Sequence, residues 1–441
     1  MIAGVPILVR DPVGYLRSEL GSLDHAFLDA ERRKKWLEKV GRELELPNIT
    51  LDRHRDVADV QSARLEMFRS LLEPARKVLE TLGDAPGESP GVRRKGWTLE
   101  SLIPYLLRDW TNTSELETTT SLVGDAVKRQ FPDVSAKSLA FAACGAGGLL
   151  KNLSTGFARV FGFDLTLPVL VAARHLLDGE TLELAMPRSS SETGSISLRG
   201  RQALPSDPQI ELLAMDVFHT AFPDESIDCL VTAYLIDLVP DPRRLAAEIW
   251  RILSVGGIWI NFGPSGRQDA LWRFDQPETR AIFEAAGFGI EQSEAHRSTL
   301  LDLSRDIPSW NFRNEICYLT TAKKTGRSIR SKKIAPPTAA DSSKIIPQHF
   351  PGAYLIERQS LGQDRTCTLV YRYENIPSHV ENVEVGTDTA QILELVDGQR
   401  SVGEIVRILE QSEPVRHADE TLHAFASYFA QGLLTWRVRG Q

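Results

Sequence analysis

Glycines and aspartates stand at places in the middle of the chain where they could bind a cofactor. The segment Cys144–Gly148 reads Cys-Gly-Ala-Gly-Gly and follows the short apolar run 138–143. Glycine at the turn after a strand lets a ligand approach the backbone, because a Cβ there would block it. Asp164 and Asp216 end later apolar runs, and their carboxylates could accept hydrogen bonds from sugar hydroxyls and from a base edge. This order predicts a site for an adenosine-containing cofactor.

The cofactor that fits this pattern is S-adenosylmethionine (SAM), whose methionine end must lie close to backbone and whose ribose needs a carboxylate acceptor. Each feature alone also has a structural explanation, since glycines make ordinary turns and a strand-end Asp caps a helix as readily as it binds a ligand. The acidic residue that ordinarily precedes such a loop is absent, because Phe141 and Ala142 occupy its place. The expected cofactor-binding residues of this region are Gly145, Gly147, Asp164, Asp216, Val217 and Ala233.

Two further polar residues are candidates for catalysis. Methyl transfer is an in-line displacement at a sulfonium carbon, so alignment and desolvation supply most of the rate. Asp237 follows the fourth apolar run, and its carboxylate could orient an N–H of the acceptor or take its proton. Asn261 could give a second contact to the acceptor. The alternatives are that Asp237 caps the helix that begins near Pro242 and that Asn261 satisfies backbone groups at a strand end.

Length, charge and cysteine content limit the classes of protein to be considered. The 441 residues are too many for one core, so about two to three domains are expected. A net charge of −8 argues against nucleic-acid binding, which needs a clustered basic surface. The four cysteines form no CxxC pair, and no metal-ligand spacing occurs. Without a signal-peptide or membrane-span pattern, a soluble cytoplasmic protein is expected.

The elements that must position these residues alternate between strands and helices. Short apolar runs at 138–143, 160–163, 210–214, 227–235 and 258–262 are separated by helical patterns. This alternation predicts an α/β fold with a mostly parallel, Rossmann-like sheet. The segment 181–207 is polar and rich in Ser, Gly and Pro, and is expected to be a long surface loop.

The flanking regions differ from the centre. Residues 1–118 have helical periodicity and predict an N-terminal helical domain before the methyltransferase domain at 119–323. A basic, Pro-containing segment at 324–345 predicts a linker. Residues 346–441 predict a separate α+β module, in which Ser401 and Glu404 form a capping box after an Asp397-Gly398 turn. Strands at 353–356, 366–372 and 435–438 and three helices, the last at 418–434, indicate a winged-helix-like fold.

Three segments of residues 55–322 resemble the carnosine N-methyltransferase family. They are Leu-Leu-Arg-Asp-Trp-Thr at 106–111, Leu-Ile-Asp at 235–237 and Gly-Gly-Ile-Trp-Ile-Asn-Phe-Gly-Pro at 256–264, and Glu-Ile-Cys at 315–317 matches a further family position. The resemblance implies a class I methyltransferase fold and SAM as the cofactor. It implies that Arg108 reaches the SAM carboxylate, where a guanidinium suits the charge, and that Asp237 orients the methyl acceptor. The alternative to a SAM-binding role for the segment 108–110 is a structural one, in which it packs between domains.

The sequence departs from that family where the family holds its imidazole substrate. A family His aligns with Gln268 or its neighbours, and family tyrosines appear as Asn311, Phe312 and Arg313. Gln268, Phe312 and Arg313 are therefore expected to contact an acceptor other than carnosine. A family Gln three residues before Arg108 is replaced by Tyr105.

The run 392–405 resembles the small peptide chaperone of pyrroloquinoline-quinone biosynthesis, whose fold recurs as a leader-peptide recognition element. The resemblance implies strand addition of a leader peptide and a methyl acceptor within a ribosomally made peptide. A dimerisation or regulatory module, and with it a homodimer, is the alternative. The chain is thus expected to N-methylate a peptide residue or a small imidazole or amine compound. The competing hypothesis is a non-catalytic SAM-binding protein that presents a peptide to other enzymes.

Overall fold

A computed structural model of the chain gives the arrangement of these elements. The described residues up to 326 form one compact unit, and those from 343 onward form a second. The domain boundaries expected at 118/119 and 323/324 stay predictions. The structure describes residues 1–43, 47–82, 99–111, 113–187, 194–200, 208–239, 242–264, 276–301, 313–326, 343–348, 354–359, 365–373, 376–385, 387–412, 421–422, 424–425 and 435–438.

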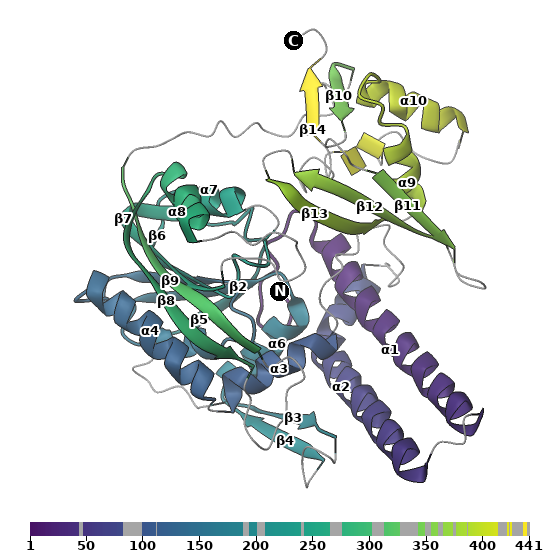
Figure 1. Cartoon of the computed structure of the whole chain (residues 1–441), viewed down its shortest axis with the longest axis horizontal. Coiled ribbons are helices and arrows are strands. Elements are labelled where there is room, and N and C mark those ends of the chain that lie inside the picture. Colours follow the sequence, from purple (N-terminus) through teal and green to yellow (C-terminus); the bar gives the residue numbers. More distant parts are fainter. Residues whose placement is uncertain are drawn as a thin grey trace. The chain divides into compact units, whose positions relative to one another are not determined.

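The first unit begins with the helices that the sequence predicts. Figure 1 shows α1 and α2 as two long helices lying side by side, which the contacts between them confirm. Thr113 caps α4 by accepting a hydrogen bond from Leu116 N at 3.2 Å. The helices of this unit are α1 (Pro12–Glu43), α2 (Asn48–Thr81), α3 (Leu99–Trp110), α4 (Ser114–Gln130), α5 (Gly148–Leu153), α6 (Leu167–Leu177), α7 (Pro242–Ile252) and α8 (Gln276–Ala285).

A seven-stranded sheet forms the centre of the unit, in the order β5-β2-β1-β6-β7-β9-β8. The strands from β5 to β7 are parallel, and β9 runs antiparallel to both of its neighbours. The strand order reverses between β1 and β6, the point where α/β proteins bind ligands. The strands are β1 (Ser138–Ala142), β2 (Arg159–Asp164), β5 (Ile210–Ala214), β6 (Ile227–Ala233), β7 (Leu253–Gly263), β8 (Phe288–Leu300) and β9 (Arg313–Lys324). The predicted Rossmann-like α/β fold is confirmed.

Both faces of the sheet are buried, which explains its nearly continuous apolar strands. Leu139 and Phe141 of β1 pack in the core that contains residues of α1 to α6, whereas Ala140 and Ala142 face the core that contains residues of α7 and α8. The alternation follows from the two-residue period of a strand. It leaves the carboxyl ends of the parallel strands, and not their faces, available for a ligand.

The segment predicted as a long surface loop contains a hairpin, so that prediction was wrong for residues 181–185 and 195–199. Strands β3 (Thr181–Ala185) and β4 (Ser195–Arg199) pair antiparallel. Leu182, Leu184 and Leu198 are buried on one face of this hairpin. Leu182 and Leu184, two residues apart, carry the strand signal, and the Ser-rich composition after them hides it.

The second unit contains two small antiparallel sheets. β11 (Tyr354–Gln359), β12 (Arg365–Tyr373) and β13 (Ile376–Val385) form a three-stranded sheet, of which the sequence predicted the first two strands. β10 (Ile345–Gln348) pairs with β14 (Thr435–Val438), as expected for a closing strand. The helix predicted at 418–434 and the linker lie mostly outside the described residues.

Two helices of the second unit are joined by the turn that the sequence predicts. α9 (Thr387–Glu394) is followed by Gly398, whose φ is +72°. Before α10 (Val402–Ser412), Ser401 N donates to Glu404 Oε2 at 2.7 Å and Glu404 N donates to Ser401 Oγ at 3.2 Å. The capping box is therefore confirmed.

Candidate functional site

The glycine loop between β1 and α5 has a left-handed backbone, which glycine adopts without strain and other residues adopt at a cost. Ala143, Gly145 and Gly147 have φ values of +53°, +53° and +82°. A Cβ added to Gly145 would have no heavy atom within 4 Å, so this position borders open space. Gly148 is the opposite case, because its Cβ would lie 2.4 Å from the backbone oxygen of Asp109. The loop is thus open on one side and closely packed on the other.

Asp164, at the end of β2, is bonded to the glycine loop. Its Oδ2 accepts a hydrogen bond from Gly145 N at 3.0 Å and its Oδ1 accepts one from Thr166 N at 2.9 Å. Burial raises the pKa of Asp164 above its ordinary value, although these backbone donors oppose the shift. The structure therefore brings two predicted site residues, Gly145 and Asp164, together.

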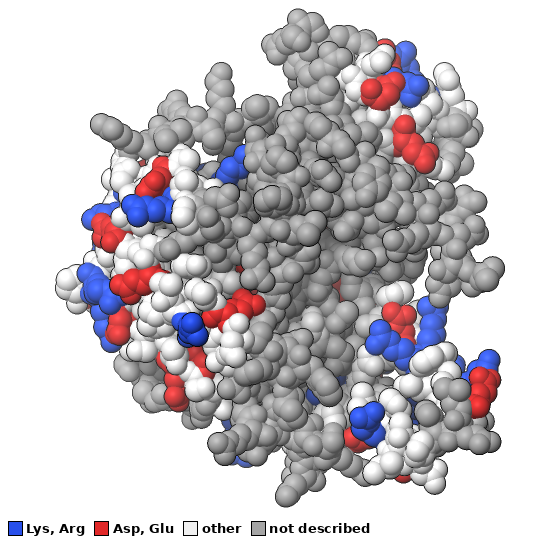
Figure 2. Space-filling view, viewed as in Figure 1, with Lys and Arg blue, Asp and Glu red and all other residues white. Residues whose placement is uncertain are grey.

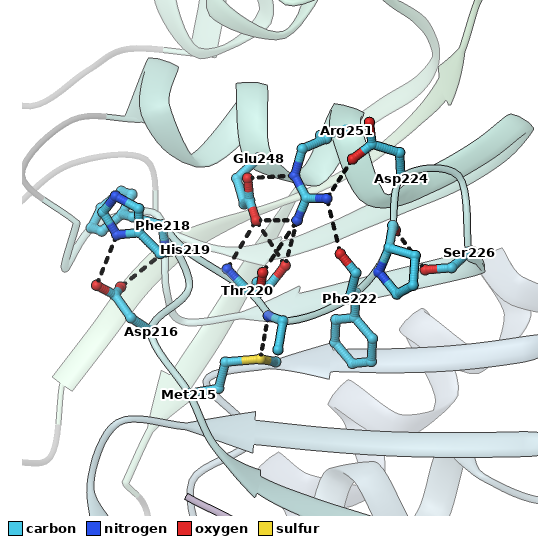
Figure 3. A network of polar contacts seen from close by, with 12 residues as sticks. Met215, Asp216, Phe218, His219, Thr220, Phe222, Asp224, Ser226, Glu248 and Arg251 are labelled. Carbon is cyan, nitrogen blue, oxygen red and sulfur yellow. Dashed lines mark hydrogen bonds and ion pairs between the residues drawn. The ribbon is translucent and has the colours of Figure 1, made fainter. Parts of the chain in front are cut away.

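Asp216 follows β5 and is held by its own loop. Its Oδ1 accepts from Phe218 N at 2.9 Å, and its Oδ2 lies 3.3 Å from His219 Nδ1. Its neighbour Val217 packs against the core on the α7 side of the sheet. Figure 3 shows the Asp216 carboxylate turned toward His219 at one end of a polar network.

The rest of that network fixes the loop after Asp216 to α7 (Figure 3). Thr220 N and Oγ1 donate to Glu248 Oε1 at 2.9 and 2.7 Å, and Arg251 Nη2 donates to the same oxygen at 2.6 Å. Burial works to raise the pKa of Glu248, but its hydrogen bonds from Arg251 and Thr220 lower it below the ordinary value. Arg251 Nη1 also donates to the backbone oxygen of Phe222 at 2.9 Å. The Glu248–Arg251 ion pair of α7 thus anchors the loop that follows Asp216 at Thr220 and Phe222.

The end of α3 is hydrogen-bonded to the glycine loop. Asp109 Oδ2 accepts a hydrogen bond from Gly148 N at 3.0 Å, and Trp110 Nε1 donates to Ala146 O at 2.9 Å. Asp109 Oδ1 accepts from Arg108 Nε at 2.7 Å. Sequence reasoning selected Arg108 and missed Asp109, although the two are adjacent in the quoted motif.

Arg108 lies in a cluster of aromatic and acidic groups. Its guanidinium carbon is 5.3 Å from the ring centroids of both Tyr105 and Tyr234, and its Nη1 lies 3.7 Å from Glu115 Oε1. Burial would lower the pKa of Arg108, but Asp109 and Glu115 raise it, so the guanidinium stays charged. Tyr105, which replaces the family's Gln, therefore serves here as a cation–π partner.

Tyr234 has a strained backbone at the carboxyl end of β6, directly after Ala233. Its φ is +54°, a conformation that costs a bulky residue on the order of 1–3 kcal/mol. Tyr234 N donates to Phe262 O at 2.8 Å, and the hydroxyl shares a hydrogen bond with Thr119 Oγ1 at 3.0 Å. These bonds hold the ring beside Arg108. Positive φ cannot be read from a single sequence, which is why Tyr234 was not anticipated.

Asp237 and Asn261 occupy different surroundings. Asp237 is 5% exposed, in the turn after β6 in which Leu238 N donates to Leu235 O. Burial raises the pKa of Cys317 to about 12, helped by the carboxylates of Glu315 and Asp237. Asn261 Oδ1 instead accepts from Thr232 Oγ1 at 2.8 Å, within the sheet. This bond joins two side chains and does not involve a strand-end backbone group, so the catalytic role of Asn261 and its structural alternative both stay predictions.

The remaining predicted acceptor contacts fall largely outside the described residues. Gln268 and Phe312 are not described, and Arg313 is described only as the first residue of β9. The part of the chain that is described holds no cluster of three or more His, Cys, Asp or Glu side chains suited to a metal ion. On the face of the molecule seen in Figure 2, basic and acidic side chains are interspersed among the described residues.

The N-terminal residues contact both aspartate-bearing strand ends, which the sequence did not predict. Leu8 N donates to Ala214 O at 2.8 Å and Ala214 N donates to Pro6 O at 2.9 Å, beside Asp216. From α1, Tyr15 Oη donates to Leu165 O at 2.9 Å and Glu19 Oε2 accepts from Leu167 N at 3.1 Å, beside Asp164. These partners are about 150 to 210 residues apart, so no local sequence signal could reveal them.

Glu19 should make the stability of the unit depend on pH. Burial and, to a smaller extent, Asp164 raise the pKa of Glu19 from 4.5 to about 8. A raised carboxyl pKa contributes stability that is present below pH 4.5 and is lost as pH rises through about 8. In thermal unfolding, Glu19→Gln is expected to match the wild type at pH 4 and to melt higher at pH 8.5, by roughly 2–4 °C per kcal/mol. Glu43→Gln, at the exposed end of α1, is the control; equal behaviour of the two variants would contradict the assignment.

Comparisons with known proteins agree with this geometry. Residues 141–261 match the family model described as "Methyltransferase domain". Carnosine N-methyltransferase of Dictyostelium discoideum is 25% identical over 193 residues, which are 38% of this chain and 41% of that protein. "Carnosine N-methyltransferase unmet" of Drosophila melanogaster is 24% identical over 222 residues, 44% of this chain and 48% of that protein. The chain thus spans less than half the length of these curated relatives.

Among solved structures, magnesium protoporphyrin IX methyltransferase from Synechocystis PCC 6803, with bound SAH, covers 60% of this chain at 11% identity and a TM-score of 0.34. All of that protein's chain is covered. Over the described residues, no helix combines the length and apolar character that a membrane span requires.

Proposed function

We propose that this chain, which carries a Rossmann-like class I methyltransferase domain and takes SAM as its cofactor, transfers the SAM methyl group to a nitrogen atom. The observation that carries the proposal is the bond between the glycine loop and the strand-end carboxylate, Gly145 N to Asp164 Oδ2. It lies beside the switch point of the sheet and inside the matched segment 141–261. Open space beside Gly145 supports the fit, since a ligand can approach the backbone there.

The chemistry of each predicted residue suits it to bind one part of the cofactor. Asp164 would accept from the ribose hydroxyls, and Gly145 and Gly147 would admit the methionine end. Arg108 would bind the methionine carboxylate through a charge-assisted bond. Asp216, with Val217 and Ala233, would line the adenine end. The charged state of Arg108, which Asp109 and Glu115 sustain, supports its role.

Bound SAM supplies an electrophilic methyl carbon on a sulfonium leaving group. The acceptor nitrogen gives its lone pair to that carbon while the carbon–sulfur bond breaks and its electron pair goes to sulfur. The chain must align the two atoms, exclude water and remove the nitrogen's proton. Asp237 is buried at the end of β6, so it can orient the acceptor N–H and take that proton.

The acceptor that we propose is a residue of a ribosomally made peptide, or a small imidazole or amine compound. The curated relatives are named for carnosine N-methylation, but Gln268, Phe312 and Arg313 replace the residues that hold imidazole in that family. The three-stranded sheet β11-β12-β13, followed by α9 and α10, has outer strands to which an extended leader could add. A tethered leader would raise the effective concentration of the acceptor.

The test is transfer of label from methyl-labelled SAM to a peptide encoded near this gene, or to carnosine and related amines. Labelled product whose mass rises by one methyl group is the expected result. Tight SAM binding with no transfer to any of these acceptors would favour a non-catalytic, peptide-presenting protein. Absence of SAM binding would overturn the proposal.

Removing the second unit should separate peptide recognition from cofactor binding. A chain ending at residue 326, after the last described residue of the first unit, is expected to keep SAM affinity. Its KM for a leader-bearing peptide should rise by about 100-fold or more, because the tethering is lost. Its KM for the same peptide without leader should not change. Equal KM values for the full and shortened chains with the leader-bearing peptide would exclude leader recognition.

A further inference from the structure

The glycine loop has no acidic residue from its own strand, and a carboxylate from another element takes that place. Phe141 and Ala142 of β1 are buried apolar residues. The side chain of Asp109, at the end of α3, is 1% exposed and accepts a hydrogen bond from Gly148 N at 3.0 Å. The two residues are 39 positions apart in the sequence. The loop is therefore held by the helical region and not by the strand before it.

The same carboxylate also sets the direction of Arg108. Asp109 Oδ1 accepts from Arg108 Nε at 2.7 Å, while Arg108 Nη1 lies 3.7 Å from Glu115 Oε1. Tyr105 and Tyr234 each lie 5.3 Å from the guanidinium carbon and restrict its tilt. A bond to an ionised partner is about twice as strong as a neutral one. One buried side chain thus connects the backbone of the loop to a cation.

We propose that Asp109 is a positioning residue that joins Arg108 to the glycine loop, so that the two contacts for the methionine end of SAM form a single preorganised unit. The inference rests on the proposed function. We assign Asp109 itself no contact with the cofactor, because its side chain is 1% exposed and lies between Arg108 and the backbone of the loop. Replacing Asp109 should weaken binding of the methionine end of SAM. Binding of the adenosine end, for which we propose Asp164, should not change.

Two ligands separate these ends. S-adenosylhomocysteine carries the amino-acid carboxylate and ammonium, whereas 5′-methylthioadenosine has the adenosine half without them. By calorimetry on the full chain, Asp109→Asn is expected to weaken S-adenosylhomocysteine binding about tenfold to a hundredfold and to leave 5′-methylthioadenosine binding unchanged. Asn keeps the shape but places an amide where Arg108 and Gly148 N both need an acceptor. Glu117→Gln, exposed on α4, is the matched control and should change neither affinity.

An equal loss for both ligands, or no loss for either, would overturn the inference, because a general structural defect does not distinguish them. Arg108→Gln keeps the bond from Gly148 N to Asp109 and gives a second reading if D109N does not fold. It should show the same ligand selectivity, and loss of both ligands would again count against the inference. In the double variant D109N/R108Q, the loss of binding free energy for S-adenosylhomocysteine should be smaller than the sum of the two single losses, because the two residues act on the same end of the ligand. A wild-type chain that binds neither ligand would overturn the proposed function and this inference with it.

Discussion

Replacing Asp237 by Asn is expected to slow methyl transfer by about a hundredfold to ten-thousandfold while SAM affinity stays unchanged. Asp237 is 5% exposed, lies in the turn that follows β6, and has no assigned part in binding the cofactor. Asn keeps the size of the side chain but cannot take a proton. The effect should therefore appear in kcat, and SAM binding measured by calorimetry should not report it.

The pH profile distinguishes proton removal from mere orientation of the acceptor. If Asp237 accepts a proton, the wild-type rate should fall at acidic pH, because the protonated carboxyl group cannot act as a base. The rate of D237N should not show this fall at acidic pH. Asp125→Asn, at an exposed position of α4, controls for the loss of one negative charge. Turnover of D237N at the wild-type rate would remove Asp237 from the catalytic residues.

Replacing Gly148 by Ala is expected to destroy SAM binding and to destabilise the first unit by about 1–3 kcal/mol. The added Cβ would lie 2.4 Å from the backbone oxygen and 2.9 Å from the Cα of Asp109. Neither atom can move without pulling α3 from the loop and breaking the Asp109–Gly148 hydrogen bond. Thermal unfolding and calorimetric titration with SAM would measure the two effects.

Two other glycines make the comparison specific. Gly145→Ala meets no neighbouring atom, so it should block SAM while costing only the strain of its left-handed backbone, about 1–2 kcal/mol. Gly124 lies within α4, where an added Cβ would be 3.6 Å from Leu153 Cδ2, an ordinary contact. Gly124→Ala should raise stability by up to about 1 kcal/mol and leave SAM binding intact. If G148A bound SAM with the same affinity as G124A, the close packing of α3 on the glycine loop would not be required for SAM binding.

Local sequence patterns predicted those site residues that lie at the ends of strands. The glycines, Asp164 and Asp216 each follow a strand whose apolar run is visible in the sequence, and the parallel topology brings their ends to one edge. The capping box from Ser401 to Glu404 is likewise a local pattern, of four residues. The hairpin β3–β4 was missed because its alternating leucines are few and its connection is polar.

Contacts between distant segments could not be predicted in the same way. Asp109 meets Gly148 only because α3 packs across the loop, and Glu19 meets Leu167 only because α1 lies against the start of α6. Tyr234 depends on a positive φ that no propensity of Tyr suggests. Each of these residues looks ordinary in the sequence, and tertiary packing alone gives it a role.

The pairing of residues 6–8 with Ala214 has a consequence for synthesis of the chain. β5 is an outer strand of the sheet, and an uncovered outer strand can pair with another molecule. The segment that covers it leaves the ribosome some 200 residues earlier than its partner (214 − 8 = 206). At about 5–20 residues per second, the interval is roughly ten to forty seconds. During that time residues 6–8 must stay available for the pairing that completes this end of β5.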